Sequence, residues 1–441
     1  MFHQIRIRAE DQHAQRFLWR DCDSSKKPDI YVMQVMTFGS TCSPSCAQAV
    51  KNHNAEKFRT NYPVAAEAIV KQHYVDDYLD SFDELDKATK IVQQVMKIHD
   101  HAGFHIRNFT SNSRELLQSL PSERVQALTV KMFEEKDSMT EKVLGVYWNT
   151  TSDTLGYQIK LDKLGSDVTQ MLRLPTKREV LAFVMSVYDP LGLISNITVH
   201  GRILMQKLYI ENIDWDDEIP ENLQSDWQHW LEVIESAESV TIPRYILEER
   251  TGEVELHTFV DASEQAFCAC VYIRNVSGNT PHVRLLSAKS RVAPVKPLSI
   301  PRLELQAAVL GSRLTKSIID ETRLNIVSKT FWSDSQTVLS WIKSPKRRST
   351  FVMHRVGEIL EDNRKNEWRW VPTDENSADE GTKEKLGKSQ WFEGPDFLKL
   401  SEPSWPSTEE KETDEELRET VLVHEELCKL SFIDKYKEYS D

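Results

Sequence analysis

The sequence has little that would direct it to a membrane or out of the cell. Its most apolar long stretch, residues 180–210, is interrupted by Asp189-Pro190 and is charged near its end by Arg202 and Lys207. Insertion of these charged groups into a bilayer would be costly. The start of the chain also lacks the apolar core of a secretory signal peptide. We therefore expect a protein with no membrane partner that works inside the cell, in the cytoplasm or the nucleus.

Cysteine is scarce as well, and none of the six cysteines forms a C-x-x-C pair. Cys268 and Cys270 alternate as strand positions do. His424 and Cys428 lie close in the sequence, but one histidine and one cysteine fall short of the four ligands of a structural zinc site. Free structural thiols in a reducing compartment are the expectation that fits this usage.

The sequence lacks a positive net charge, since its formal charge is −14. Much of the excess lies in residues 402–441, where 13 acidic and 5 basic residues give a local charge of −8. Residues 341–370 have the opposite balance, with 8 basic and 4 acidic residues that include Lys346-Arg347-Arg348. This basic run is either a solvated loop or, if its domain binds a polynucleotide, a contact to the nucleic-acid backbone.

The length of the chain and its changing residue patterns predict several domains of mixed α+β and α/β class. A single core rarely grows past ~250 to 300 residues. Residues 1–160 mix short strands with helices, and residues 165–250 are mainly helical. Over residues 253–386 the alternation of strands and helices predicts a sheet layer covered by helices. Residues 387–441 are rich in Pro, Ser and Glu, so we expect a poorly ordered acidic linker and tail.

Four acidic residues of the region 253–386 stand at strand ends or near helix starts. Asp261 ends an apolar strand, Glu304 lies in a first helical turn, Asp334 ends a second apolar strand, and Asp379 follows an aromatic strand. Taken singly, each fits a turn or a helix-dipole interaction. The order strand-Asp, helix-Glu, strand-Asp, helix-Asp resembles the ribonuclease H fold, whose four acids converge on two metal ions.

This resemblance implies a specific chemistry for the C-terminal region. Asp261, Glu304, Asp334 and Asp379 would hold two Mg²⁺ or Mn²⁺ ions, one activating water and the other stabilising the leaving oxygen. The implied substrate is the RNA strand of an RNA–DNA hybrid. Many ribonucleases H carry a histidine before the last acid, and here Trp370 lies near that place. The departure concerns proton transfer rather than metal binding.

A second acidic motif lies in the first 160 residues. Asp76 and Asp77 stand between β-favouring apolar residues, which predicts a hairpin whose tight turn holds both carboxylates. Two such charges repel each other, and a divalent cation relieves the repulsion. An exposed turn without a function is the alternative. Tyr74-Val75-Asp76-Asp77 resembles the catalytic turn of reverse transcriptases, which implies that both Asp residues are metal ligands of a polymerase palm.

Another segment strengthens the likeness to reverse transcriptases. Phe38-Gly39 is followed at a short distance by Ser43-Pro44. In that family the corresponding segment lies under the templating base and the incoming nucleotide. The resemblance also implies that Phe2 screens the sugar 2′ position.

Further segments are similar to the Pol polyprotein of Pao/BEL-type LTR retrotransposons, namely residues 103–112, 144–148 and 189–192. In that family a third metal-binding Asp stands four residues ahead of the position held here by Met1. We therefore expect an N-terminally truncated RNA-directed DNA polymerase domain that polymerises poorly or not at all. The integrase and protease of such polyproteins are the protein partners that the resemblance implies.

The leading hypothesis is a metal-dependent ribonuclease H attached to a palm that holds primer-template without extending it. A non-catalytic, nucleic-acid-binding remnant is the alternative. A third interpretation, an aspartic peptidase, follows the naming of the Pao connecting region. It requires an Asp-Thr/Ser-Gly triplet, and the closest strings, at Asp153 and Asp261, do not fit.

Overall fold

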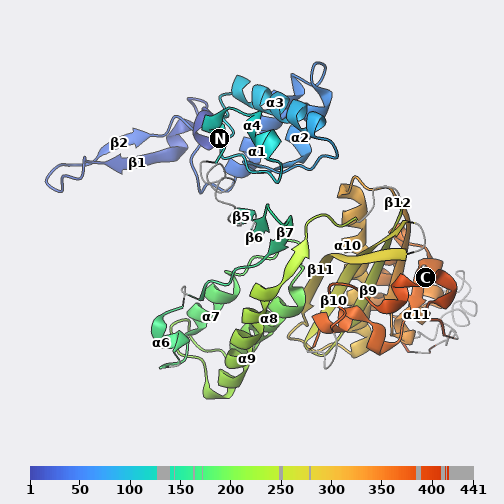
Figure 1. The fold of residues 1–441 in the computed structure, drawn as a ribbon. Helices are drawn as coiled ribbons and strands as arrows, with labels where there is room; N and C mark the ends of the chain where they lie inside the picture. The colour runs from blue at the N-terminus through green and yellow to red at the C-terminus, as the bar shows by residue number, and fades with distance from the viewer. Residues whose placement is uncertain are drawn as a thin grey trace, which may run out of the picture. The chain divides into compact units, whose positions relative to one another are not determined.

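The structure of the protein, a computed structural model, has two compact units that are described separately (Figure 1). The N-terminal unit holds residues 1–141 and 150–152, and the C-terminal unit holds residues 142–149 and 153–441. The residues whose structure is described are 1–126, 140–143, 145–161, 164–170, 172–247, 252–277, 280–383, 389–408, 413, 415 and 416. Leu144 of the predicted palm segment and most of the predicted tail, with His424 and Cys428, lie outside them. Within the described part of the chain, no helix is both long and apolar enough to cross a bilayer.

The N-terminal unit is built mainly from helices, with two short β-hairpins. The helices are α1 (Ser43–Glu56), α2 (Pro63–Lys71), α3 (Leu85–His101) and α4 (Arg114–Gln118). One hairpin joins β1 (Arg16–Trp19) to β2 (Asp29–Val32), and the other joins β3 (His73–Tyr74) to β4 (Asp77–Tyr78). Short 3₁₀ helices lie at Phe2–Gln4, Gln12–Gln15 and Ser122–Arg124. Ile91, Val95 and Ile98 recur at helical spacing on α3, and this apolar face packs against α1 and α2. Because α2 also contacts β3, the packed helices carry the β3–β4 hairpin.

The β1–β2 hairpin projects from the helices of this unit (Figure 1). It exposes large apolar side chains on both strands, since Leu18 is 66% exposed and Ile30 is 67% exposed. Phe17 stacks on Tyr31 across the strands, with ring centroids 5.7 Å apart. A cross-strand aromatic pair of this kind stabilises a two-stranded hairpin that would be marginal alone.

A small sheet and a group of helices precede the main sheet of the C-terminal unit. The small sheet has the order β5 (Thr140–Val143, of which Lys142 and Val143 belong to this unit), β6 (Val146–Asn149), β7 (Thr154–Gly156) and β8 (Thr241–Pro243). The helices are α6 (Ser166–Thr169), α7 (Lys177–Val184), α8 (Ser195–Ile210) and α9 (Gln224–Glu235), with 3₁₀ helices at Glu221–Leu223 and Ser236–Ser239. A capping box starts α7, because Thr176 and Glu179 each accept a hydrogen bond from the other's backbone N–H. Trp227 and Trp230 of α9 are buried beside Phe183 of α7. These rings join the helices into one apolar layer.

The main sheet is mixed and has five strands. Their order is β11 (Thr280–Val292), β10 (Ala266–Ser277), β9 (Glu253–Ala262), β12 (Ile326–Ser333) and β13 (Trp368–Trp370). The first three strands pair antiparallel, whereas β12 runs parallel to both β9 and β13. The helices that connect or follow these strands are α10 (Ile300–Glu321), α11 (Gln336–Lys343) and α12 (Thr350–Asp362), and 3₁₀ helices lie at Lys365–Glu367, Thr373–Glu375, Ser377–Gly381, Asp396–Lys399 and Glu402–Ser404.

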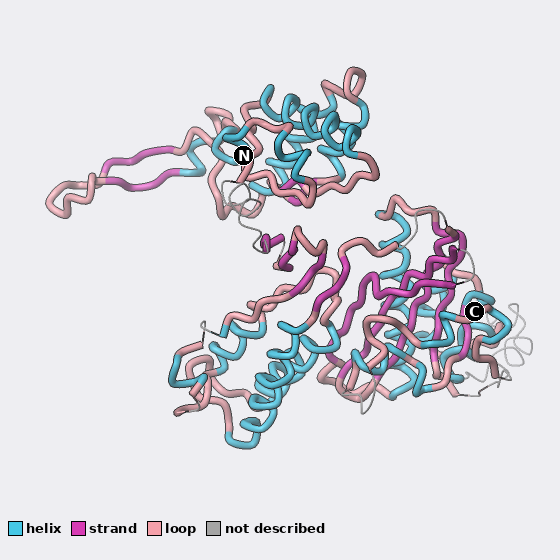
Figure 2. Tube along the Cα trace, in the orientation of Figure 1, coloured by secondary structure: helices cyan, strands magenta, loops and turns pink. Residues whose placement is uncertain are grey.

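Helices cover both faces of this sheet (Figure 2). Adjacent residues of a strand point to opposite faces, and the strands are apolar on both. Val260 and Phe331 share a core with α10, α11 and α12. Phe259 and Trp332, each next in sequence to one of these, belong to a second core with α7, α8 and α9. The sheet is therefore a middle layer between helices, as its strand and helix alternation predicted.

The predicted helical region 165–250 is part of the same compact unit as the sheet. The Asp189 carboxylate accepts hydrogen bonds from the backbone N–H groups of Leu193 and Ile194, both at 3.0 Å, and so fixes the turn that leads into α8. Gly192 has φ +73°, and a Cβ atom there would stand 1.7 Å from the backbone oxygen of Ala288 on β11. This close backbone contact joins the helices to the sheet, so the boundary predicted near residue 250 does not separate two cores.

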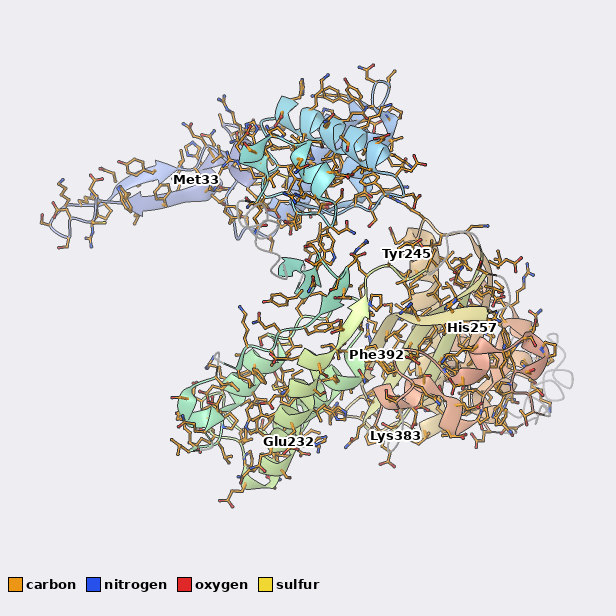
Figure 3. All side chains as sticks on the ribbon, in the orientation of Figure 1. Met33, Glu232, Tyr245, His257, Lys383 and Phe392 are labelled. Carbon is orange, nitrogen blue, oxygen red and sulfur yellow. The ribbon has the colours of Figure 1, made fainter. Side chains whose placement is uncertain are left out.

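The expectation of a poorly ordered linker from residue 387 is wrong for residues 389–405. Trp391 and Leu398 are fully buried in the core shared by α8 and the sheet. The indole N–H of Trp391 donates to the backbone oxygen of Leu193 at 2.7 Å. The backbone N–H of Leu285 on β11 donates to the backbone oxygen of Phe392 at 3.0 Å, and Phe392 is labelled in Figure 3. Residues 389–405 form a strap in which 7 of 17 residues are Pro, Ser or Glu, but its aromatic and leucine side chains decide where it packs.

Candidate active site

Asp261 lies at the end of β9 and is almost completely buried, with 6% of its surface exposed. Its carboxylate accepts a hydrogen bond from the hydroxyl of Thr382 at 2.7 Å. Burial raises the pKa of Asp261 to about 7, and the neighbouring charges of Asp334 and Asp379 act in the same direction. Asp261 is thus electrostatically coupled to two of the other acids that the sequence singled out.

Asp334 follows β12, and the parallel pairing of β12 with β9 places the ends of both strands at the same edge of the sheet. Its carboxylate accepts hydrogen bonds from the Thr373 hydroxyl at 2.8 Å and from the Asn376 side-chain amide at 3.3 Å. The same amide group donates to the backbone oxygen of Val260 at 3.1 Å. Asn376 therefore links Asp334 to the residue before Asp261.

Glu304 lies near the start of α10, where it accepts a hydrogen bond from the hydroxyl of Ser335. Burial raises the pKa of Glu304, and the charges of Asp334 and Glu415 add to this effect. Because Ser335 also caps α11 by accepting from the Val338 N–H, the contact fixes α10 against the start of α11. The carboxylate of Glu304 is thereby held beside Asp334.

Asp379 lies in the 3₁₀ helix Ser377–Gly381 and is 7% exposed. Its carboxylate oxygen is 2.6 Å from the ammonium nitrogen of Lys383, one of the side chains labelled in Figure 3. Hydrogen bonding to Asp379 raises the pKa of Lys383, and the charges of Asp379, Asp261 and Asp334 act in the same direction. A cationic group of the chain itself therefore stands in the field of three of these acids.

The four predicted acids share one end of the sheet, and each already has a hydrogen-bonding or ionic partner. Among the residues that the structure describes, no three acidic, histidine or cysteine side chains form a group that could hold a metal ion. The hydroxyls of Thr382, Thr373 and Ser335 and the ammonium of Lys383 each contact one oxygen of one of the four carboxylates. Carboxylates are nevertheless the ligands that hard divalent cations prefer. A cation that binds here would compete with these partners for the carboxylates, and with the Lys383 ammonium for their negative charge.

The comparison with known proteins bears on this arrangement. Residues 176–335 match the family model of the Pao retrotransposon-like RNaseH-like domain. The match starts at the cap of α7 and ends one residue after Asp334. It thus supports a Pao-type ribonuclease H-like region that includes the helical layer as well as Asp261 and Glu304. No curated protein matches the chain.

Beyond the matched residues, Trp370 stands near the place where a histidine was expected from the resemblance. Its indole N–H donates to the backbone oxygen of Asp334 at 3.2 Å. The indole group is a donor only and cannot accept or shuttle a proton at neutral pH. Trp370 therefore positions the chain around Asp334.

The basic run has two different environments. Lys346 and Arg347 are exposed, whereas Arg348 is 2% exposed. The Arg348 guanidinium donates to the backbone oxygens of Glu415 at 2.6 Å and Thr413 at 3.0 Å. Arg348 was predicted to contact the nucleic-acid backbone, but in this structure its guanidinium is buried against the C-terminal segment.

In the N-terminal unit, the predicted hairpin around Asp76 and Asp77 is present as β3 and β4, with Tyr74 paired to Asp77. Val75 has φ +57°, an uncommon conformation for a β-branched residue. Burial raises the pKa of Asp77, and the charge of Asp76 adds to the shift. The two carboxylates are thus close enough to influence each other.

The structure also brings the other predicted palm residues near this hairpin. Phe2 is buried, and its ring centroid lies 4.8 Å from that of Phe38. Val75 packs against the same apolar cluster as Phe2. Three segments that are separate in the sequence therefore meet in one place.

The segment that follows Phe38 turns sharply into α1. Gly39 has φ +89°, and a Cβ atom added there would meet no other atom within 4 Å, so the turn is open on that side. Ser43 is buried, and its hydroxyl donates to the backbone oxygen of Thr37 at 2.8 Å. Pro44 stands in the first turn of α1, where its missing N–H costs no helical hydrogen bond.

A buried polar cluster behind the Asp76-Asp77 hairpin was not predicted. The Nε2 atoms of His73 and His99 are 3.1 Å apart, and burial lowers their pKa values to about 3 and about 4. The ammonium of Lys51 donates to the backbone oxygen of Ile69 at 2.7 Å, and burial lowers the pKa of Lys51 to about 8. Nothing in the sequence marked these residues, because they come from three different elements.

In the C-terminal unit, sequence reasoning likewise missed Thr382, Asn376 and Lys383, which are the partners of the acids.

Proposed function

We propose that this chain is a metal-dependent ribonuclease H that cleaves the RNA strand of RNA–DNA hybrids. The observation that carries the proposal is that Asp261 and Asp334 stand at the ends of the parallel-paired strands β9 and β12, where the Asn376 amide donates both to Asp334 and to the residue before Asp261. Like charges held together in a buried place are costly unless a cation joins them. The match of residues 176–335 to a Pao retrotransposon-like RNaseH-like domain supports a nuclease of the ribonuclease H type in general.

In this proposal Asp261, Glu304, Asp334 and Asp379 hold Mg²⁺ or Mn²⁺. Bound ions of this kind activate a water molecule and stabilise the leaving oxygen of a phosphodiester. The surrounding residues keep the carboxylates in place, and Asn376 ties the end of β9 to Asp334. The exposed side chains of Lys346 and Arg347 remain candidates for contact with the nucleic-acid backbone.

We further propose that the N-terminal unit is part of an RNA-directed DNA polymerase domain and that it holds primer-template. Its support is the meeting of three segments around the β3–β4 hairpin. Asp76 and Asp77 would bind metal there. The residues proposed to contact nucleotide or template are Phe2, Phe38, Gly39, Ser43 and Pro44.

One observation favours a second function, nucleic-acid binding without cleavage. Every one of the four acids is engaged by a donor of the protein itself, including the Lys383 ammonium at Asp379. A chain in which these partners were never displaced would bind a hybrid without hydrolysing it.

Cleavage of a labelled RNA–DNA hybrid by the full chain in Mg²⁺ separates the two functions. We expect fragments of the RNA strand only, with none from a matched DNA duplex, and no cleavage by Asp334→Asn. Binding of the hybrid by a folded wild-type chain that leaves the RNA intact would favour the binding function. Cleavage that persists in Asp334→Asn would point to another site or a contaminant.

Replacing Lys383 by Met is expected to raise the affinity for divalent cations about threefold to fivefold. The ammonium neutralises carboxylate charge at the place where a cation would bind, and a partly exposed ion pair is worth roughly 0.2–1 kcal/mol. The thermal unfolding midpoint, titrated with Mg²⁺ and with Mn²⁺, reports this affinity without reference to activity. Lys399→Met, which removes a lysine paired with Asp396 outside the acidic group, is the control. An equal change in both variants would show that Lys383 has no special relation to the acids.

A further inference from the structure

The described part of the C-terminal tail is attached to the nuclease-like layer by several polar contacts. The Glu416 carboxylate accepts a hydrogen bond from Arg302 at 2.6 Å, and its backbone oxygen accepts from the Ser349 N–H at 2.9 Å. The Thr413 N–H donates to the Ser340 hydroxyl oxygen at 3.2 Å. Together with the two bonds from Arg348 to Thr413 and Glu415, these interactions form what we call the tail contact.

The tail contact lies beside the proposed active site. Arg302 precedes Glu304 by two residues on α10, and the charge of Glu415 contributes to the raised pKa of Glu304. Ser349 is the cap of α12, so its N–H has no acceptor within the helix and donates outward from the helix start. Guanidinium groups and helix-start N–H groups are the donors that also bind phosphate oxygens.

The acidic segment adopts an unfavourable conformation to make this contact. Glu416 has φ +60°, a region that residues other than glycine rarely adopt. The Arg302–Glu416 ion pair is partly exposed, with 33% and 18% of the two side chains accessible. A ligand with several phosphates could therefore displace the segment, because it offers more anionic oxygens to the same donors.

We propose that Thr413, Glu415 and Glu416 act as an intramolecular competitor of nucleic acid at the Arg302–Ser349 surface. The inference rests on the proposed ribonuclease H function, because it assumes that a hybrid binds beside Glu304. The occupant is the chain's own acidic segment, and the ligand that it excludes is a nucleic-acid backbone. Charge complementarity supports this choice, since residues 402–441 carry a local charge of −8.

Binding of a fluorescent RNA–DNA hybrid to the full chain in EDTA tests the competition without cleavage. Glu416→Gln weakens the tail contact, and we expect it to bind the hybrid about fivefold more tightly than the wild type. Glu393→Gln makes the same change of charge at a 75% exposed position outside the contact, and it should change affinity less than about twofold, by roughly the general charge effect. Equal affinities of the wild type and Glu416→Gln would overturn the proposal.

Arg302→Gln tests whether Arg302 binds the nucleic-acid backbone as well as Glu416, or Glu416 alone. If Arg302 serves both the tail and the phosphates, its loss weakens hybrid binding although it also frees Glu416. Tighter binding by Arg302→Gln would mean that the arginine holds only the tail, which overturns the shared surface.

Hydrogen exchange gives an independent measurement. Addition of the hybrid should increase exchange in peptides that contain Thr413 to Glu416, because the ligand releases them. Unchanged exchange while the hybrid is bound would contradict displacement and leave the nuclease proposal standing. A folded chain that neither binds nor cleaves the hybrid, with Glu416→Gln equally inactive, would instead overturn the nuclease proposal and the competition with it.

Discussion

Asp261→Asn is expected to lose at least about a thousandfold in the rate of hybrid cleavage and, in the absence of metal, to unfold less readily than the wild type. The loss follows because the amide cannot supply the negative charge that the proposed ions need. The gain in stability follows because the charged Asp261 carboxylate of the wild type is buried near the charges of Asp334 and Asp379, whereas the amide is neutral. One substitution should therefore move activity and stability in opposite directions.

The stability gain should depend on pH. The pKa of Asp261 is raised from 3.8 to about 7, so the folded chain holds a proton that the unfolded chain has lost between these values. The stability that this group contributes is fully present below about pH 4 and is lost as the pH rises through about 7. This loss of unfolding free energy is on the order of 2–4 kcal/mol. The Asp261→Asn variant should not show it.

Urea unfolding of both proteins in EDTA, at about pH 5 and about pH 8, measures the difference. The variant should gain less at the lower pH and most at the higher one. Equal pH dependence of wild type and variant would show that the carboxylate is not destabilised by its surroundings. Cleavage by the variant within about tenfold of the wild type would remove Asp261 from the proposed site, whatever its stability.

Gly192→Ala is expected to lower the free energy of unfolding of the C-terminal unit by about 3 kcal/mol or more. Gly192 has a positive φ, and the new Cβ atom would meet the backbone oxygen of Ala288 at 1.7 Å. A backbone oxygen within a strand cannot rotate away as a side chain can. The substitution should therefore separate the start of α8 from β11 and weaken the layer that holds the acids.

Gly394→Ala is the matched control for this prediction. Gly394 also has a positive φ, +69°, but the atoms around its Cβ position belong to the side chains of Val283 and Tyr272, the nearest at 3.1 Å. It should cost only the conformational penalty, about 1 kcal/mol. Similar losses for the two variants, measured by chemical denaturation, would mean that the contact with Ala288 relaxes easily and that the helices are not rigidly fixed to the sheet.

The sequence predicted the parts of this structure that depend on local pattern. Asp261 and Asp334 end apolar strands, and parallel pairing of neighbouring strands is sufficient to bring such ends together. The Asp76-Asp77 hairpin follows in the same way from two β-favouring flanks and a tight turn. In each case the residues that define the element lie within a few positions of the acid.

Other features depend on contacts between distant segments, which a single sequence does not reveal. The burial of Trp391 depends on Leu193, 198 positions earlier, so composition alone marked this stretch as a linker. Arg348 looked like a phosphate contact because it belongs to a basic run, yet its partners lie 65 and 67 positions further on. Nothing in the sequence marked Lys383 as part of the site, because it belongs there through its contact with Asp379 and the nearby charges of Asp261 and Asp334.

The strap that covers the sheet has a consequence for how the chain reaches its native state during synthesis. The hydrogen bond between Trp391 and Leu193 closes a loop of 198 residues, and the core beneath it stays incomplete until Trp391 has been translated. At ~5–20 residues per second this interval is roughly 10–40 s. Trp332 is translated 59 residues before Trp391, so for roughly 3–12 s of that time the face of the sheet formed by Phe259 and Trp332 lacks part of its cover. The nascent chain is therefore exposed to aggregation and to chaperone binding well after its first strands have formed.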